Sequence, residues 1–140
     1  MALIADSGAI YALYDSRDRH HSAVADLIAE ESETIILPMA ILAEIDYLLR
    51  VRLGNRAVLR FLEGIRIGGY ILEPLTPQDL IRCVSLIQTY ADLNLGIADA
   101  SVIATAERLD TGRILTVDER HFRAIRSAKG SPFTLLPADA

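Results

Sequence analysis

Short apolar runs alternate along the chain with longer stretches in which apolar residues recur at helical spacing. Such runs are typical of strands that are buried on both faces, and these strands occur mainly in parallel sheets. We therefore predict a mainly parallel sheet whose strands cover residues 3–6, 34–38, 69–75 and 112–117, with 133–137 as a candidate last strand.

Helical patterns fill the intervals between the predicted strands. They cover residues 9–14, 22–31, 39–53, 56–67, 77–91 and 98–109. The boundaries carry the residues expected at helix ends, namely Pro38, Thr76 and Pro77 at starts and Gly54, Gly68 and Gly112 at stops. Strands that alternate with one or two helices predict an α/β fold, a three-layer sandwich in which helices flank the sheet, with residues 1–140 as a single domain.

Composition limits the classes of protein that fit the chain. Its net charge of −5 argues against a broad basic coat for nucleic acid, although it leaves room for a local basic patch. No apolar run approaches the ~20 residues that span a bilayer, and no basic segment precedes the first apolar run as in a signal peptide. The single cysteine, Cys83, cannot form a disulfide within the chain. We therefore expect a cytoplasmic protein without a membrane partner.

Acidic residues stand where the predicted strands end. Asp6 closes the first strand, and Asp118 directly follows the strand at 112–117. Asp99 opens a helix that runs antiparallel to the strand after it, so the start of this helix lies at the same edge of the sheet. Parallel α/β sheets bind ligands outside the carboxyl ends of their strands. The topology thus predicts that these carboxylates meet where a ligand would bind.

Helical spacing adds a fourth acid. At about 100° per residue, Asp99 falls in the middle of the apolar face of its helix, and Glu44 falls within the apolar arc of residues 39–53. Asp46 and Arg50 fall on the outward face. Glu44, however, lies about six residues into its predicted helix, or roughly 9 Å from the sheet edge. The pattern alone therefore does not bring Glu44 to the other acids.

Each acid also has a purely structural explanation. Asp6 can cap the following helix, Asp99 can favour its own helix N-terminus, and Asp118 can hold a turn. For a single acid the two explanations carry about equal weight. Several acids at one edge favour function, because like carboxylates raise one another's pKa and a divalent cation resolves that conflict. Oxygen ligands without an accompanying Cys or His predict Mg²⁺ or Mn²⁺ and phosphoryl chemistry.

Four ordered blocks resemble a PIN-domain nuclease, most closely a VapC-like toxin of a bacterial type II toxin–antitoxin pair, along nearly the full chain. ADSGAIYAL resembles the family's opening strand with its first acid, Asp6, and PMAILAEIDYLL resembles the segment that carries its glutamate, Glu44. LGIADASVIATAERL is similar to the block that carries Asp99, and ILTVDERHF is similar to the closing block with Asp118.

The resemblance implies a PIN-like fold and Mg²⁺- or Mn²⁺-dependent endoribonuclease activity on an RNA substrate. It also implies a homodimer and a cognate antitoxin protein that occludes the active site. On this hypothesis Asp6, Glu44 and Asp99 are the catalytic metal ligands, and Asp118 completes the acidic metal site. A metal-bound water would then hydrolyse the phosphodiester bond.

Other polar residues are weaker candidates for the site. Ser7 and Thr116 match hydroxyl positions of the family. Asp92 and Asn94 lie in the loop before Asp99, from which they could reach the outer coordination shell of the metal. We treat all of them as supporting residues.

The densest basic stretch comprises Arg50, Arg52, Arg56 and Arg60. A solvated helix face is the ordinary explanation for such residues. Contacts with RNA phosphates or with an acidic segment of a partner are the functional alternative. His121 is expected to pack or to bond locally within its own segment.

Other classes of protein place acids and Mg²⁺ at the same edge of a sheet. A phospho-receiver domain needs paired acids after the first strand and a lysine near the last, whereas ADSG offers one acid and the only lysine is Lys129. A Mg²⁺-dependent phosphatase of the haloacid dehalogenase type needs Asp-x-Asp there, and Gly8 occupies the second position. A PIN-fold binding or regulatory protein without catalysis remains an alternative, although all four expected acids are present.

Overall fold

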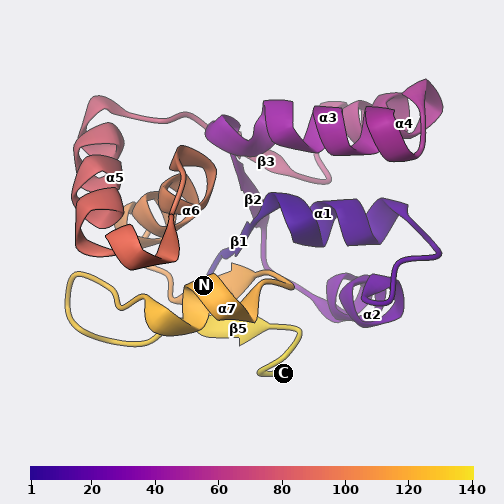
Figure 1. Cartoon of the computed structure of the whole chain (residues 1–140). Helices are drawn as coiled ribbons and strands as arrows, with labels where there is room; N and C mark the ends of the chain where they lie inside the picture. The colour runs from indigo at the N-terminus through magenta and orange to yellow at the C-terminus, as the bar shows by residue number, and fades with distance from the viewer.

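Five short strands form one parallel sheet in the order β3-β2-β1-β4-β5 (Figure 1). The computed structural model describes residues 1–140, and its strands are β1 (Leu3–Ala5), β2 (Ile35–Pro38), β3 (Ile71–Glu73), β4 (Arg113–Leu115) and β5 (Thr134–Leu136). Ile4 of β1 lies opposite Ile36 of β2 on one side and Ile114 of β4 on the other. The carboxyl end of β1 therefore lies in the middle of one edge of the sheet.

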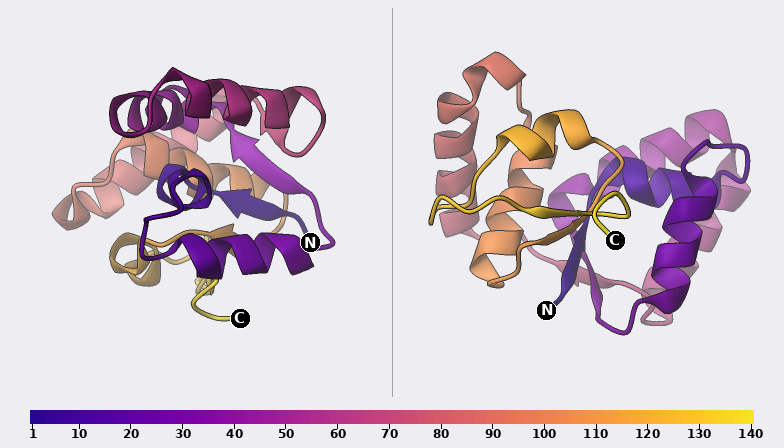
Figure 2. Two further views of the ribbon diagram at one scale, coloured as in Figure 1. Left: turned by 90° about the vertical axis from the view of Figure 1, so that its right-hand side faces the viewer. Right: turned by 90° about the horizontal axis from the view of Figure 1, so that it is seen from below.

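Helices cover both faces of this sheet. They are α1 (Ser7–Tyr14), α2 (His21–Glu30), α3 (Leu42–Arg52), α4 (Asn55–Arg66), α5 (Pro77–Thr89), α6 (Ile97–Arg108) and α7 (Glu119–Ala124). Helices α5 and α6 lie on one side of the sheet, and α1 to α4 lie on the other (Figures 1 and 2). The predicted α/β sandwich of three layers is confirmed, and the sheet is parallel throughout.

The central strands are buried on both faces, as their apolar sequences predict. Leu3, Ile4 and Ala5 of β1 and Ile114 and Leu115 of β4 have no exposed surface. Burial of an aliphatic side chain of this size contributes about 1.5–3 kcal/mol. These strands therefore anchor the sheet edge at which the acidic residues follow. None of the helices combines the length and the apolar character needed to span a bilayer.

The predicted start of the helix at 39–53 is wrong. Pro38 ends β2 in an extended conformation, because it pairs with Glu73 of β3 in the sheet. Met39–Ile41 then form a 3-10 turn, and α3 begins at Leu42.

The predicted helix stop at Gly112 is also wrong. Helix α6 ends with Asp110 in the left-handed conformation, at φ 52°, which aspartate tolerates better than most residues. The Thr111 N–H then donates to the Ala106 carbonyl at 2.9 Å and closes the last turn. Gly54 and Gly68 do end helices as predicted, at φ 97° and 86°.

The sequence pattern did not predict α7, because its six residues are too few to display a helical period. Two contacts hold this helix. The Asp118 side chain accepts from the His121 N–H at 3.2 Å as an N-cap, and Phe122 is buried in the core. Helix α7 thus begins directly at the acidic edge of the sheet.

Thr76 caps α5 as predicted, and Pro77 occupies the first helical position. The Thr76 hydroxyl accepts from the Asp79 N–H at 3.0 Å, and the Asp79 carboxylate accepts from the Thr76 N–H at 3.0 Å. This reciprocal pair satisfies two backbone donors that the helix itself cannot satisfy.

Replacing Thr76 with Ala should lower the free energy of unfolding by about 1 kcal/mol, because the cap of the Asp79 N–H is lost. Urea denaturation followed by circular dichroism measures the change. Ser85→Ala, at an exposed position within the same helix, is the matched control and should leave stability nearly unchanged. Equal stability of the two variants would show that the cap contributes nothing.

Candidate active site

Four acids gather at the carboxyl edge of the sheet, each at the start of a helix. Asp6 and Asp118 follow β1 and β4 and are the N-cap residues of α1 and α7. Glu44 and Asp99 lie in the first turns of α3 and α6. Helix N-termini carry partial positive charge, which stabilises a nearby carboxylate. The fold therefore compensates part of the repulsion among these acids.

Asp6 is the most buried of the four, with 4% of its surface exposed. One carboxylate oxygen accepts from the Ala9 N–H at 2.9 Å, and the other accepts from the Thr116 hydroxyl. The pKa of Asp6 is raised to about 7 as the net result of three effects: burial raises it most, the two hydrogen bonds lower it, and the negative charges of Asp99 and Asp118 raise it. The structural explanation for Asp6, a helix cap, is thus correct without excluding a function.

Glu44 reaches the site, although the sequence pattern placed it too deep in its helix. Because α3 begins at Leu42, Glu44 lies in the first turn and its carboxylate accepts from the Ser7 hydroxyl at 2.6 Å. The expectation that Glu44 faces the core is wrong, since the residue is exposed. Asp46 and Arg50 face outward as predicted and pair with each other at 2.8 Å.

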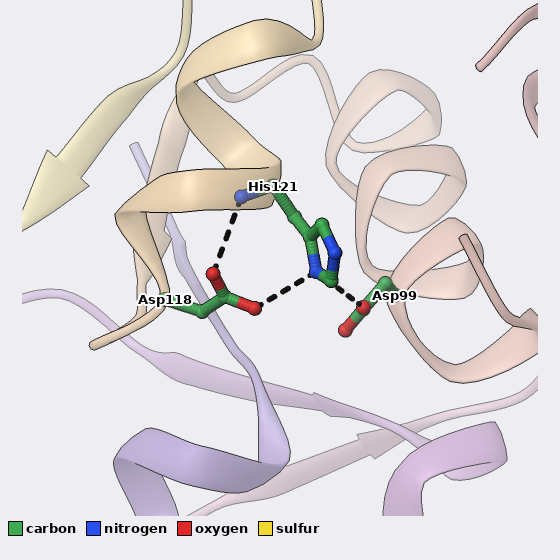
Figure 3. Close-up of side chains that lie close together, drawn as sticks. All are labelled: Asp99, Asp118 and His121. Atoms are coloured by element: carbon green, nitrogen blue, oxygen red, sulfur yellow. Dashed lines mark hydrogen bonds and ion pairs between the residues drawn. The ribbon is translucent and has the colours of Figure 1, made fainter. Parts of the chain in front are cut away.

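Asp99 and Asp118 face each other across the ring of His121 (Figure 3). The His121 Nδ1 lies 2.9 Å from an Asp118 oxygen and 3.4 Å from an Asp99 oxygen. Burial raises the pKa of Asp99, the positive field of His121 lowers it, and the carboxylates of Asp118 and Glu44 raise it again, with an upward shift as the net result. Asp99 is thus electrostatically coupled to each of the other three acids, and Asp6 is also coupled to Asp118.

His121 contacts Asp118 within its own segment, as the sequence predicts, but its approach to Asp99 was not predicted. The three-residue spacing in DERH puts the histidine one turn after the N-cap Asp118 once the segment is helical. The sequence pattern does not predict that helix, α7, because it has only six residues. The donor atoms of Asp99, Asp118 and His121 all lie within 4.8 Å of one another.

The two predicted hydroxyl residues both touch the site. Thr116 is buried, donates to Asp6, and accepts from the Asp118 N–H at 2.9 Å, so it ties the two acids together. Ser7 is the first residue of α1, whose N-cap is Asp6, and its hydroxyl donates to Glu44.

Asp92 and Asn94 are exposed, and no hydrogen bond or ion pair joins them to the four acids. Asp92 lies in the 3-10 turn Ala91–Leu93, and Asn94 follows it in the left-handed conformation, at φ 53°. The structure therefore does not bring these two candidates to the site.

Two of the four arginines in the predicted basic stretch have side-chain partners within the chain, and two do not. Arg50 bonds Asp46 and Asn55, and the Arg52 guanidinium stacks over the Tyr11 ring at 5.0 Å. Arg56 and Arg60 on α4 are exposed and form no ion pair. Arg56 and Arg60 thus have guanidinium groups that are free for a ligand.

The donor set fits a divalent cation. Carboxylate oxygens are hard ligands for such ions, and imidazole nitrogen is a common metal ligand. The Nδ1 of His121 is buried and makes no hydrogen bond, although carboxylate oxygens lie beside it. A buried polar atom without a hydrogen bond is costly, and a cation among these groups would satisfy it. The structure thus defines an α/β protein with a candidate metal centre at the carboxyl edge of its sheet.

Comparisons with known proteins identify the family. The sequence model of the PIN domain matches residues 3–127. The chain is 33% identical to Ribonuclease VapC26 of Mycobacterium tuberculosis over 135 residues, which cover 96% of this chain and 100% of that protein. The chain therefore belongs to the PIN domain family, as its four sequence blocks predict.

Solved structures share the fold. VapC20 of Mycobacterium tuberculosis, a sarcin–ricin loop cleaving toxin, matches with a TM-score of 0.73 and 19% identity over 80% of this chain and 86% of that chain. A toxin–antitoxin complex from Klebsiella pneumoniae matches with a TM-score of 0.69 and 15% identity over 88% of this chain and 92% of that chain. At these identities the likeness is one of fold.

The raised pKa of Asp6 predicts how stability depends on pH without metal. Because the folded state binds the Asp6 proton more tightly than the unfolded state does, the contribution of Asp6 falls as pH rises from about 4 towards 7 and is constant above that. Relative to Asp6→Asn, the wild type should lose up to about 1.4 kcal/mol of unfolding free energy per pH unit in this window.

Urea denaturation in EDTA tests this dependence, with measurements at about pH 5, 6 and 7 inside the window set by the shifted pKa and at about pH 8 above it. Asn is a good N-cap, so the variant keeps the cap of α1. Asp26→Asn, on the exposed side of α2, is the matched control and should parallel the wild type at every pH. A constant difference between wild type and Asp6→Asn would contradict the prediction.

Proposed function

We propose that this chain is a divalent-metal-dependent endoribonuclease and the toxin of a toxin–antitoxin pair. The observation that carries the proposal is the convergence of Asp6, Glu44, Asp99 and Asp118 at the carboxyl edge of a PIN fold. The similarity to Ribonuclease VapC26 supports RNA as the substrate. The likeness to a toxin–antitoxin complex supports an antitoxin as partner.

We propose the same four acids as the metal site, with Mg²⁺ or Mn²⁺ as the ion. When bound, such an ion supplies positive charge for the phosphoryl oxygens and lowers the pKa of a coordinated water. The chain's own residues set the geometry: Thr116 holds Asp6, and Ser7 holds Glu44. Neither Asp6 nor Glu44 is free to rotate without losing its hydroxyl partner.

Two further assignments complete the proposal. Arg56 and Arg60, exposed and unpaired on α4, are candidates for contact with RNA phosphates or with an acidic segment of the antitoxin. A homodimer acting on cytoplasmic RNA is the state in which we expect the protein to work.

Asp99→Asn and Asp6→Asn should each lower RNA cleavage by on the order of a hundredfold or more while the protein stays folded, because each removes a proposed metal ligand. Purified protein without antitoxin is incubated with total bacterial RNA and Mg²⁺ or Mn²⁺, with EDTA as the metal-free control. Asp26→Asn should cleave like the wild type. An inert wild type that is folded and binds metal would instead favour a binding protein without catalysis.

Ser7→Ala should lower cleavage by roughly ten- to a hundredfold, because Glu44 loses the hydroxyl that positions it. The comparison is made at saturating metal and again across a metal titration, which separates weaker metal binding from slower cleavage. Ser22→Ala, at an exposed position of α2, is the matched control. Activity equal to that of the wild type would show that Ser7 does not position Glu44.

A further inference from the structure

His121 lies beside two acids of the site, Asp99 and Asp118, and brings a nitrogen atom to them. We propose that its Nδ1 is a nitrogen ligand of the metal ion, so that the centre has a mixed nitrogen and oxygen ligand set and prefers Mn²⁺ to Mg²⁺. This inference rests on the proposed metal-dependent function, and it names the ion that serves it.

The Nδ1 atom of His121 lies close to two carboxylates. It lies 2.9 Å from an Asp118 oxygen and 3.4 Å from an Asp99 oxygen, so its neighbours belong to the two acids that face each other across the ring (Figure 3). Adjacent ligands of an octahedral ion with bonds of ~2.1 Å lie about 3 Å apart. The two distances from Nδ1 are close to this spacing, and all three donor atoms lie within 4.8 Å of one another, near enough to share one ion.

The direction in which the His121 ring points also fits a metal ligand. Nδ1 is buried and has no hydrogen bond, even though a carboxylate oxygen lies 2.9 Å away. The oxygens must therefore lie to the side of the axis along which Nδ1 would donate a proton. Ligands of one ion have this relation, because each points at the ion and not at its neighbour. A simple ion pair would align the N–H with a carboxylate oxygen.

Helix α7 fixes the ring in this place. The Asp118 carboxylate accepts from the His121 N–H at 3.2 Å with one oxygen and faces Nδ1 with the other. Phe122, the next residue, is buried in the core and anchors the helix. The backbone of His121 is therefore fixed by the fold, with Nδ1 beside the Asp118 carboxylate.

A nitrogen donor changes the ion that the centre selects. Mg²⁺ binds almost entirely through oxygen, whereas first-row transition ions accept imidazole as well as carboxylate. Among the ions proposed for this site, only Mn²⁺ gains from His121. The preference for Mn²⁺ therefore depends on His121, because the carboxylates can bind either Mg²⁺ or Mn²⁺.

Pulsed electron paramagnetic resonance of Mn²⁺ bound to the purified full-length protein tests the proposal directly. The echo-envelope modulation should show a coupled ¹⁴N nucleus in the wild type, and labelling the histidines with ¹⁵N should convert it to ¹⁵N coupling without any mutation. His121→Asn should abolish the coupling, and His20→Asn, at the N-cap of α2, should keep it.

Calorimetric titrations complete the test. His121→Asn should weaken Mn²⁺ binding by roughly ten- to a hundredfold and leave Mg²⁺ binding within about threefold. Bound Mn²⁺ without histidine coupling would overturn the assignment of His121 and leave the nuclease proposal standing. A folded wild type that binds neither ion and cleaves no RNA would overturn both proposals.

Discussion

Repulsion among carboxylates at one edge of the sheet is the constraint around which this structure is organised. Each of the four acids meets a source of positive field: Asp6 and Asp118 cap helices, and Glu44 and Asp99 lie in first helical turns. Hydroxyl donors from Ser7 and Thr116 add to this field. Burial first, and the neighbouring negative charges second, still raise the pKa values of Asp6 and Asp99, so these donors do not offset the full cost of the site.

The helix caps and the proposed metal ligands are therefore the same residues, which use different oxygens for different contacts. Asp118 uses one oxygen to cap α7 and turns the other towards His121. Asp6 caps α1 with one oxygen and receives the Thr116 hydroxyl with the other. Both carboxylates are held on one side by a backbone N–H, so a cation that binds the cluster meets two ligands that are already oriented. Preorganisation of this kind reduces the entropy that binding must otherwise overcome.

The sequence predicted the fold well because the sheet leaves a strong local signal. Runs such as Leu3 to Ala5 are apolar throughout, and burial on both faces explains why. The position of Glu44 was harder to predict, because the 3-10 turn at Met39–Ile41 depends on Pro38 staying paired with β3. That pairing is a tertiary contact, and helical periodicity within residues 39–53 carries no trace of it.

His121 is the residue beside the acids whose place the sequence did not predict. Four acids without Cys or His predict an oxygen site, whereas the proposed nitrogen ligand adds an imidazole to it. The histidine enters through α7, a helix of six residues that exists because Asp118 caps it and Phe122 anchors it. The acid that helps to form the site thus also starts the helix that delivers the nitrogen. In this fold the capping of a short helix and the chemical character of the metal centre depend on the same residue.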